Sequence, residues 1–216
     1  MTEKPDRVVV RGLKDVAAAE TRISFVDPKG ALYYLGYNID DLVGRVIYAE
    51  VAYLLIHKRL PNRQELEDFK SSLFQEMRLP GEIVESVKSS QKTCHPMEVL
   101  RTEISHLGEY DPEGNEFSDD ANIRRATRLV AQVPTLVAAI YRSRVGLPIL
   151  PPREDFGFAD NFLYMFRGEP PSEIETRVLH RFMILHADHG FNASTFAARV
   201  TASSNSDMYS AVTSAP

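Results

Sequence analysis

LVAQVPTLVAAIY, residues 129–141, is apolar at nearly every position. A helix that carries apolar side chains all round its surface is buried on most sides by other elements. We therefore predict a buried helix here, kinked at Pro134 and ended by the proline-rich stretch LPILPP, residues 147–152. Such a helix indicates a domain in which other helices pack around it.

Helical signals recur on both sides of this stretch. Apolar residues keep helical spacing from Ile39 to Leu55, and Asn62 with Glu65 forms the capping-box pattern that begins a helix. Further helices are expected after three more start signals: Leu79-Pro80-Gly81, His95-Pro96, and Ser172 with Glu175. The last of these signals predicts one long helix that continues through residues 186–200.

One β segment stands out, near the N-terminus. TRISFVDPKGALYYLGY, residues 21–37, alternates around the turn sequence Asp27-Pro28-Lys29-Gly30, which predicts a short hairpin. GEYDPEGNEFSDD, residues 108–120, is acidic and poor in apolar residues, and we interpret it as a solvent-exposed loop. Together these patterns predict a mainly α fold, a single helical domain over residues 1–216 with a short N-terminal β-hairpin.

Composition excludes several classes of protein. With 44% hydrophobic and 25% charged residues, the 216-residue chain has the balance of a soluble globular protein. Its formal net charge of -5 argues against nucleic-acid binding, which needs a concentrated basic face, and the single cysteine, Cys94, excludes an intrachain disulfide. The starting sequence MTEKPDRVVVRG is typical of neither a secretory signal nor a transit peptide, and no later stretch is apolar enough to span a membrane. We expect a cytoplasmic protein without nucleic-acid or membrane partners.

HADHGFNAST, residues 186–195, concentrates polar groups in the predicted long helix. Continued at 100° per residue, that helix places His186, His189 and Asn192 on one broad apolar stripe. Burying such groups unpaired costs about 1 to 3 kcal/mol each, so they are expected to be paired. The partners are either other protein groups, in a polar network between packed helices, or a ligand.

Three site chemistries can be compared for this segment. Two histidines three residues apart can reach one metal ion, but there is no His-Glu-x-x-His pattern and no cysteine nearby, so we expect no metal. A hydrolytic triad is disfavoured because Ser194 and His189 diverge on a helix and no Gly-x-Ser-x-Gly turn occurs. What remains is anion recognition, since imidazoles and an amide supply donors that suit carboxylate oxygens.

Six stretches of the chain, in order, resemble the citrate synthase family. Individually each stretch is a weak signal, whereas their ordered agreement is specific. They cover residues 11–42, 48–66, the His-Pro-Met segment at 94–108, the apolar helix at 128–148, 161–171, and finally 185–215 with its His-x-Asp-His motif.

The resemblance implies a mostly helical, homodimeric enzyme of the tricarboxylic acid cycle, with a large and a small domain. Its reaction joins acetyl-CoA and oxaloacetate, with water, to give citrate and CoA, and acetyl-CoA is a substrate rather than a permanently bound cofactor. His189 and Asn192 match residues that contact oxaloacetate or citrate, and His186 lies behind them as a further substrate-site residue. Ser194 matches a serine that supports the catalytic histidine of the following segment.

The sequence departs from the family pattern at several positions. Gly190 and Phe191 follow the His-x-Asp-His motif where glutamate is frequent, and Leu35 replaces a common arginine. The family pattern also continues past residues 206–215. We therefore expect these 216 residues to be the N-terminal portion of the large domain, with the small domain and the catalytic acid and base absent, and to be inactive alone. A 2-methylcitrate synthase portion, using propionyl-CoA, and a non-catalytic binding or oligomerisation module with the same fold remain alternatives.

Overall fold

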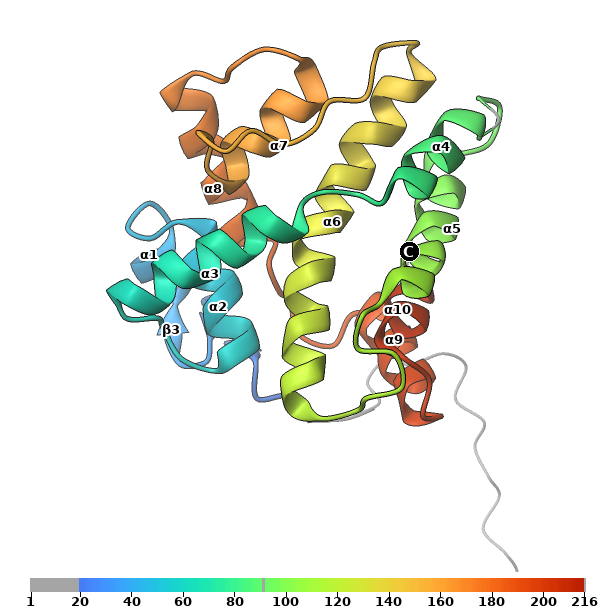
Figure 1. The fold of residues 1–216 in the computed structure, drawn as a ribbon. Coiled ribbons are helices and arrows are strands. Elements are labelled where there is room, and N and C mark those ends of the chain that lie inside the picture. The colour runs from blue at the N-terminus through green and yellow to red at the C-terminus, as the bar shows by residue number, and fades with distance from the viewer. Residues whose placement is uncertain (1–19, 91, 216) are drawn as a thin grey trace, which may run out of the picture.

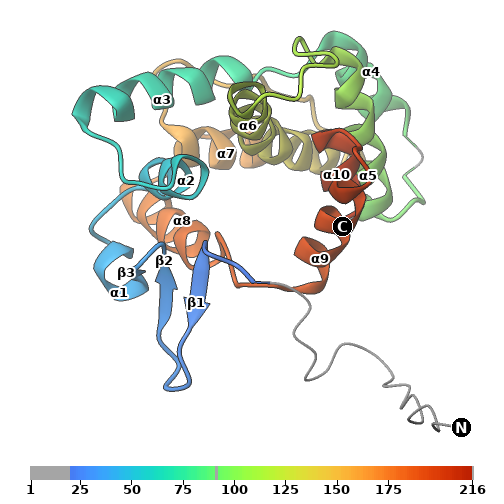
Figure 2. The same cartoon turned by 90° about the horizontal axis from the view of Figure 1, so that it is seen from below.

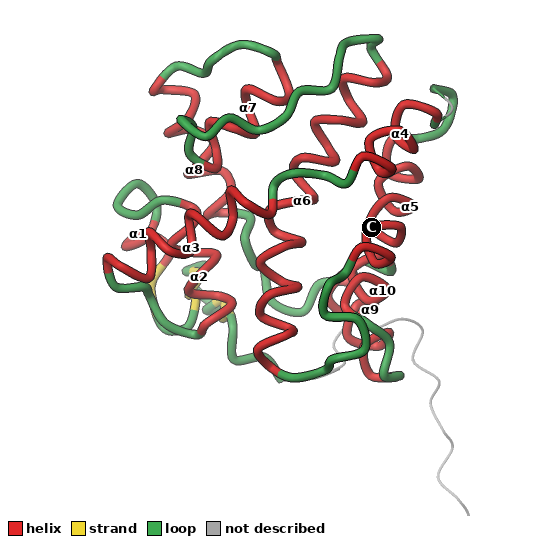
Figure 3. Tube along the Cα trace, in the orientation of Figure 1, coloured by secondary structure: helices red, strands yellow, loops and turns green. Residues whose placement is uncertain are grey.

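A computed structural model describes residues 20–90 and 92–215. Within these ranges the chain forms ten α-helices, one 3-10 helix and a three-stranded sheet, which confirms the predicted mainly α fold (Figure 3). The starting segment, predicted to be neither signal nor transit peptide, lies outside the described residues, and the single domain over residues 1–216 stays a prediction. The helices are α1 (Ile39–Leu42), α2 (Tyr48–His57), α3 (Arg63–Glu76), α4 (Gly81–Ser89), α5 (Pro96–Leu107), α6 (Asp119–Arg144), α7 (Phe158–Arg167), α8 (Glu173–Leu185), α9 (Ala193–Ser203) and α10 (Met208–Thr213), with the 3-10 helix η1 (Gly108–Tyr110).

Helix α6 occupies the middle of the fold. In Figure 1 it runs between α2 and α3 on one side and α4, α5 and α10 on the other, and it contacts each of them as well as α7. Ser118 begins it by accepting a hydrogen bond from the amide of Ala121 at 3.2 Å. The helix continues through Pro134, and Leu136 is fully buried. The predicted buried helix is confirmed, and its kink stays a prediction.

The capping signals begin helices where the sequence predicts. Asn62 and Glu65 exchange the two hydrogen bonds of a capping box at the start of α3, and Ser172 and Glu175 do the same for α8. At α5 the imidazole of His95 accepts from the amide of Met97 at 3.2 Å. These pairs succeed as predictors because both partners lie within three residues of each other.

The acidic segment 108–120 is only partly the exposed loop that its composition predicts. The carboxylate of Asp111 is 7% exposed and lies against two arginines of α6, Arg125 at 2.6 Å and Arg128 at 2.9 Å. Arg128 also reaches Glu76 of α3 at 3.1 Å and the hydroxyl of Tyr209 of α10 at 3.4 Å. The segment is therefore tied to α6 by buried charge pairs, and Arg128 extends this network to α3 and α10.

The predicted hairpin forms, and a third strand extends it. Strand β1 (Ser24–Val26) pairs antiparallel with β2 (Leu32–Tyr34), which pairs antiparallel with β3 (Tyr37–Asn38). The register places Ser24 opposite Tyr34, and the Tyr34 side chain is fully buried. It packs in a cluster with apolar residues of α1, α2 and α8, namely Leu42, Val51, Leu54 and Ile184. This cluster fixes the sheet against the end of α8.

The continuous helix predicted from Ile39 to Leu55 is wrong, because it breaks between α1 and α2. Gly44 adopts φ +81, a left-handed conformation that glycine tolerates and other residues resist. A Cβ at Gly44 would lie 3.2 Å from the guanidinium of Arg181, so this glycine also lets α8 approach closely. Hydrophobic spacing does not detect such a break. In the described part of the chain, no helix is both long and apolar enough for a bilayer crossing.

Candidate functional site

The candidate site segment, residues 186–195, is a break between two helices. Helix α8 ends before residues 186–191, and α9 begins after Asn192. The predicted long helix, with one stripe shared by both histidines and Asn192, is therefore wrong. Helix α8 has its C-cap at His186, Gly190 adopts φ +68, a left-handed conformation at which a right-handed helix cannot continue, and Asn192 caps a new helix.

Both histidines are exposed, which overturns the prediction that they are buried in an apolar stripe. The ring of His186 stacks on that of Phe182 with centroids 4.1 Å apart, and its Nδ1 lies 2.8 Å from the Phe182 carbonyl oxygen. Because a carbonyl oxygen only accepts, Nδ1 is the donor in this contact. His189 lies in the non-helical stretch, where its imidazole is exposed to solvent.

Asn192 and the helix that follows it supply hydrogen-bond donors. The Oδ1 atom of Asn192 accepts from the amide of Thr195 at 2.9 Å and so caps α9. Since Oδ1 serves as the cap, the Nδ2 group is a donor that can face outward. The first turn of α9 carries the partial positive charge of a helix N-terminus, and Ser194 is exposed within that turn. Imidazoles, an amide and a helix N-terminus suit a carboxylate ligand.

One arginine adds positive charge beside the same segment. The guanidinium of Arg199, on α9, lies 4.9 Å from the ring centroid of Phe191. Phe191 also meets Phe196 edge to face, with centroids 5.9 Å apart. Phe191 is thus held between two side chains of α9, next to Asn192. The structure places His186, His189, Asn192 and Ser194 on one short stretch, while their contact with a substrate stays a prediction.

Two residues that the local motif does not reveal hold this stretch in place. Figure 2 shows β1 and β2 beside the end of α8. The Tyr34 hydroxyl lies 3.1 Å from the carbonyl oxygen of Asp188, and Ser24 Oγ accepts from the amide of Gly190 at 2.9 Å. The partners are separated by 154 and 166 residues, so spacing within the motif carries no sign of them. The glycine at 190 is the one local signal of a tight backbone approach.

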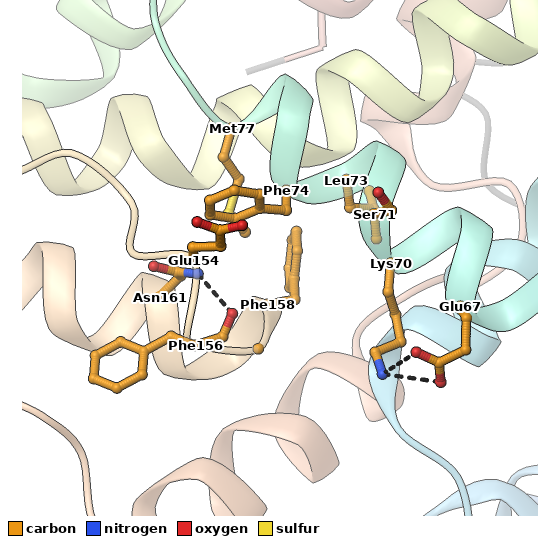
Figure 4. A pocket seen from close by; sticks show the side chains of 11 residues that line it. Glu67, Lys70, Ser71, Leu73, Phe74, Met77, Glu154, Phe156, Phe158 and Asn161 are labelled. Atoms are coloured by element: carbon orange, nitrogen blue, oxygen red, sulfur yellow. Dashed lines mark hydrogen bonds and ion pairs between the residues drawn. The ribbon is translucent and has the colours of Figure 1, made fainter.

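A separate pocket of about 300 Å³ lies between α3 and the start of α7 (Figure 4). Its floor includes Phe74, Met77 and Phe158, and at its edge Lys70 pairs with Glu67 at 3.1 Å. It shares no residue with segment 186–195. Across residues 20–90 and 92–215, no group of three or more histidine, cysteine, aspartate or glutamate side chains is placed to hold one metal ion.

Comparison with known proteins gives consistent matches. Residues 12–216 match the family model described as "Citrate synthase, C-terminal domain". Citrate synthase 2 of Bacillus subtilis (strain 168) is 49% identical over 206 residues, covering 95% of this chain and 55% of the relative. The 2-methylcitrate synthase of Mycobacterium tuberculosis (strain ATCC 25618 / H37Rv) is 42% identical over 214 residues, covering 99% of this chain and 53% of the relative.

A solved structure extends the likeness to the fold. The crystal structure of citrate synthase from Pyrobaculum aerophilum superposes with a TM-score of 0.92 at 39% identity, covering 96% of this chain and 54% of that chain. The chain spans about half the length of the curated relatives it matches. The helical fold and the resemblance drawn from six ordered stretches are both confirmed. From residue 12 to residue 216, this chain belongs to the citrate synthase family.

Proposed function

We propose that this chain forms part of the large domain of a citrate synthase, which converts acetyl-CoA, oxaloacetate and water into citrate and CoA. The family match from residue 12 to residue 216 carries the proposal. The chain contributes the stretch from His186 to Ser194, which presents imidazole and amide groups to a dicarboxylate. No cofactor is permanently bound, because the acyl group arrives on its own carrier.

Several donors of this stretch together bind oxaloacetate. His189 donates to a substrate carboxylate, and the Nδ2 group of Asn192 donates beside it, while the N-terminus of α9 adds its partial positive charge. His186 supports them from the C-cap position of α8. Ser194 supports a catalytic histidine in a following segment. The relatives extend well beyond the matched stretch, and we assign the enol-stabilising histidine and the carboxylate base to that further part.

The same proposal includes a homodimer in the cytoplasm. An apolar groove of about 360 Å³ lies between α5 and α6, and it is lined by Pro96, Met97, Leu100, Val137, Ile140, Tyr141, Arg144 and Val145. Met97 is 44% exposed and Tyr141 is 40% exposed. Contact with a second copy of the chain removes this apolar surface from water, which favours association.

A 2-methylcitrate synthase is the second candidate, with propionyl-CoA as acyl donor. The 42% identity to the Mycobacterium tuberculosis enzyme of that name supports it. The two activities differ by one methylene in the acyl group, which a pocket distinguishes by about 1 to 3 kcal/mol. Comparing acetyl-CoA with propionyl-CoA at saturating oxaloacetate separates them, because the donor with the higher kcat/KM identifies the reaction.

Calorimetric titration with oxaloacetate and with citrate tests the proposed site. We expect binding by the wild-type chain and a loss of affinity of about tenfold or more in His189→Ala. His95→Asn is the matched control, because it removes an exposed imidazole at the start of α5 while asparagine keeps the helix cap. A wild-type chain that binds neither ligand points instead to a non-catalytic binding or oligomerisation module.

A further inference from the structure

We propose that Tyr34 and Ser24 are positioning residues, which clamp the backbone on both sides of His189 so that its imidazole meets the substrate carboxylate. This inference rests on the proposed function, because it concerns how the same dicarboxylate site is held. Both residues belong to the N-terminal sheet, far from the site in sequence. Neither side chain touches the substrate in this scheme, and both act through the backbone of residues 184–190.

The hydroxyl of Tyr34 joins the end of α8 to the non-helical stretch. It lies 2.9 Å from the carbonyl oxygen of Ile184, 3.1 Å from that of Asp188 and 3.3 Å from the amide nitrogen of Asp188. A phenol has one proton to donate and can accept as well, so it serves carbonyl and amide partners together. The ring is fully buried beside Ile184, which leaves the hydroxyl little freedom to move.

Ser24 makes the second clamp from the neighbouring strand. Ser24 lies opposite Tyr34 in the β1–β2 register, so both side chains are on the same face of the sheet. Its Oγ atom accepts from the amide of Gly190 at 2.9 Å, and the Asp188 carboxylate accepts from the same amide at 3.0 Å. Ser24 is 7% exposed, so water competes little for this bond. The left-handed φ of +68 at Gly190 accompanies this orientation of its amide.

These contacts fix the residues immediately before and after His189. Asp188 is held by Tyr34, Gly190 is held by Ser24, and the imidazole between them is exposed. Burial raises the pKa of Tyr34, and the nearby Asp188 carboxylate raises it further. Hydrogen bonds with the backbone of Asp188 and Ala187 lower the pKa by less, so the net shift is upward. The hydroxyl therefore keeps its proton across the physiological range. A site group displaced by about 1 Å can lose about 100-fold in rate, so such clamping has a measurable consequence.

The chain offers a matched pair of tyrosines for the test. Tyr34→Phe removes the hydroxyl and keeps the buried ring. Tyr33→Phe removes the hydroxyl of the adjacent residue, whose side chain points to the other face of the sheet, where its ring lies 6.3 Å from that of Phe25. Ser24→Ala removes the second clamp, and Ser24→Thr keeps a hydroxyl at that position.

Two measurements on the 216-residue chain report on the clamps. Amide hydrogen exchange of residues 186–191 is expected to quicken about tenfold in Tyr34→Phe and Ser24→Ala and to stay unchanged in Tyr33→Phe. The oxaloacetate Kd from calorimetry is expected to rise about tenfold in the same two variants and to recover in Ser24→Thr. Melting temperatures from circular dichroism identify any variant that has lost the fold. If Tyr34→Phe does not fold, comparison of the oxaloacetate Kd in Ser24→Ala and Ser24→Thr decides whether the hydroxyl at residue 24 positions the site.

The outcomes separate this inference from the proposed function. If the wild type binds oxaloacetate and the Kd of Tyr34→Phe and Ser24→Ala stays at the wild-type value, the positioning role is wrong and the proposed function stands. If exchange quickens but the Kd does not change, the clamps are structural only and the inference is overturned. If the wild type binds no oxaloacetate, the proposed function fails, and the inference fails with it.

Discussion

Asp111 is the shared anion between two nearly buried arginines, so Asp111→Ala should be strongly destabilising. Its carboxylate lies 2.6 Å from Nε of Arg125 and 2.9 Å from Nη1 of Arg128, whose side chains are 1% and 7% exposed. Breaking a buried charge pair by removing one partner costs about 3 to 5 kcal/mol, because a charge is left buried without compensation. Arg128 keeps Glu76 at 3.1 Å, and Arg125 keeps the Gly114 carbonyl oxygen at 2.8 Å. We therefore expect the lower end of that range, about 3 kcal/mol.

Thermal unfolding followed by circular dichroism measures this loss. For a chain of this size, 1 kcal/mol corresponds to about 2 to 4 °C in Tm, so Asp111→Ala should lower Tm by about 6 to 12 °C. Asp111→Asn keeps the side-chain volume and should lose most of the same stability, since the missing charge causes the effect. Burial lowers the pKa of Arg128, but the hydrogen bonds with Tyr209 and Glu76 and the negative charge of Glu76 raise it more, so the guanidinium stays charged throughout the assay.

Glu109→Ala is the matched control from the same segment. Its carboxylate is 76% exposed and lies 4.0 Å from His106, and exposed substitutions of this kind change stability by less than about 0.5 kcal/mol. If Asp111→Ala lowers Tm by no more than Glu109→Ala does, the reasoning about buried charge pairs in this fold is refuted.

Three further outcomes follow from the geometry. Burial lowers the pKa of His180, whose Nδ1 accepts from the amide of Tyr48 at 3.2 Å. Below about pH 6.5 the His180 imidazole binds a proton more readily in the unfolded chain than in the folded one, so the free energy of unfolding should fall as the pH drops. Urea unfolding between pH 7.5 and pH 5 measures this fall, which should be smaller in His180→Gln. Gly190→Ala places a Cβ on a residue with φ +68 and should lower the free energy of unfolding in urea by about 1 to 2 kcal/mol. Gly190→Asn should lower it less, because asparagine tolerates that conformation. Equal losses in the two variants would count against backbone strain at this position. Asn192→Ala removes the hydrogen bond from the amide of Thr195 and should lower the free energy of unfolding by about 1 kcal/mol. The same substitution should weaken citrate binding. Unchanged citrate affinity in calorimetry would exclude the Asn192 side-chain amide from the site.

The sequence predicts those parts of the fold whose causes are local. Asn62 with Glu65 and Ser172 with Glu175 each place donor and acceptor within one turn, and both begin helices as expected. The apolar stretch 129–141 becomes the interior of α6, because a helix with no polar face has to be covered on most sides. Family resemblance adds what periodicity cannot, namely membership of the citrate synthase family, from which a reaction can be proposed.

The site escapes prediction where its causes are distant in sequence. Apolar spacing continues across residues 186–195, so periodicity extends a helix through a stretch that Gly190 and the cap at Asn192 interrupt. The bonds from Tyr34 and Ser24 that hold the stretch cross more than 150 residues. The His-x-Asp-His motif therefore predicts site residues without revealing that both histidines are exposed or which side chains hold the backbone around them.

Release of CoA from acetyl-CoA in the presence of oxaloacetate tests the proposed activity most directly. The enzyme is residues 1–216 joined to the part of the Bacillus subtilis relative that lies outside the match, since the matched part is 49% identical. We expect thiol release that requires oxaloacetate, falls at least about tenfold in His189→Ala and persists in His95→Asn. A folded fusion protein that releases no thiol, or that releases it equally well after His189→Ala, would contradict a citrate synthase site built on this segment.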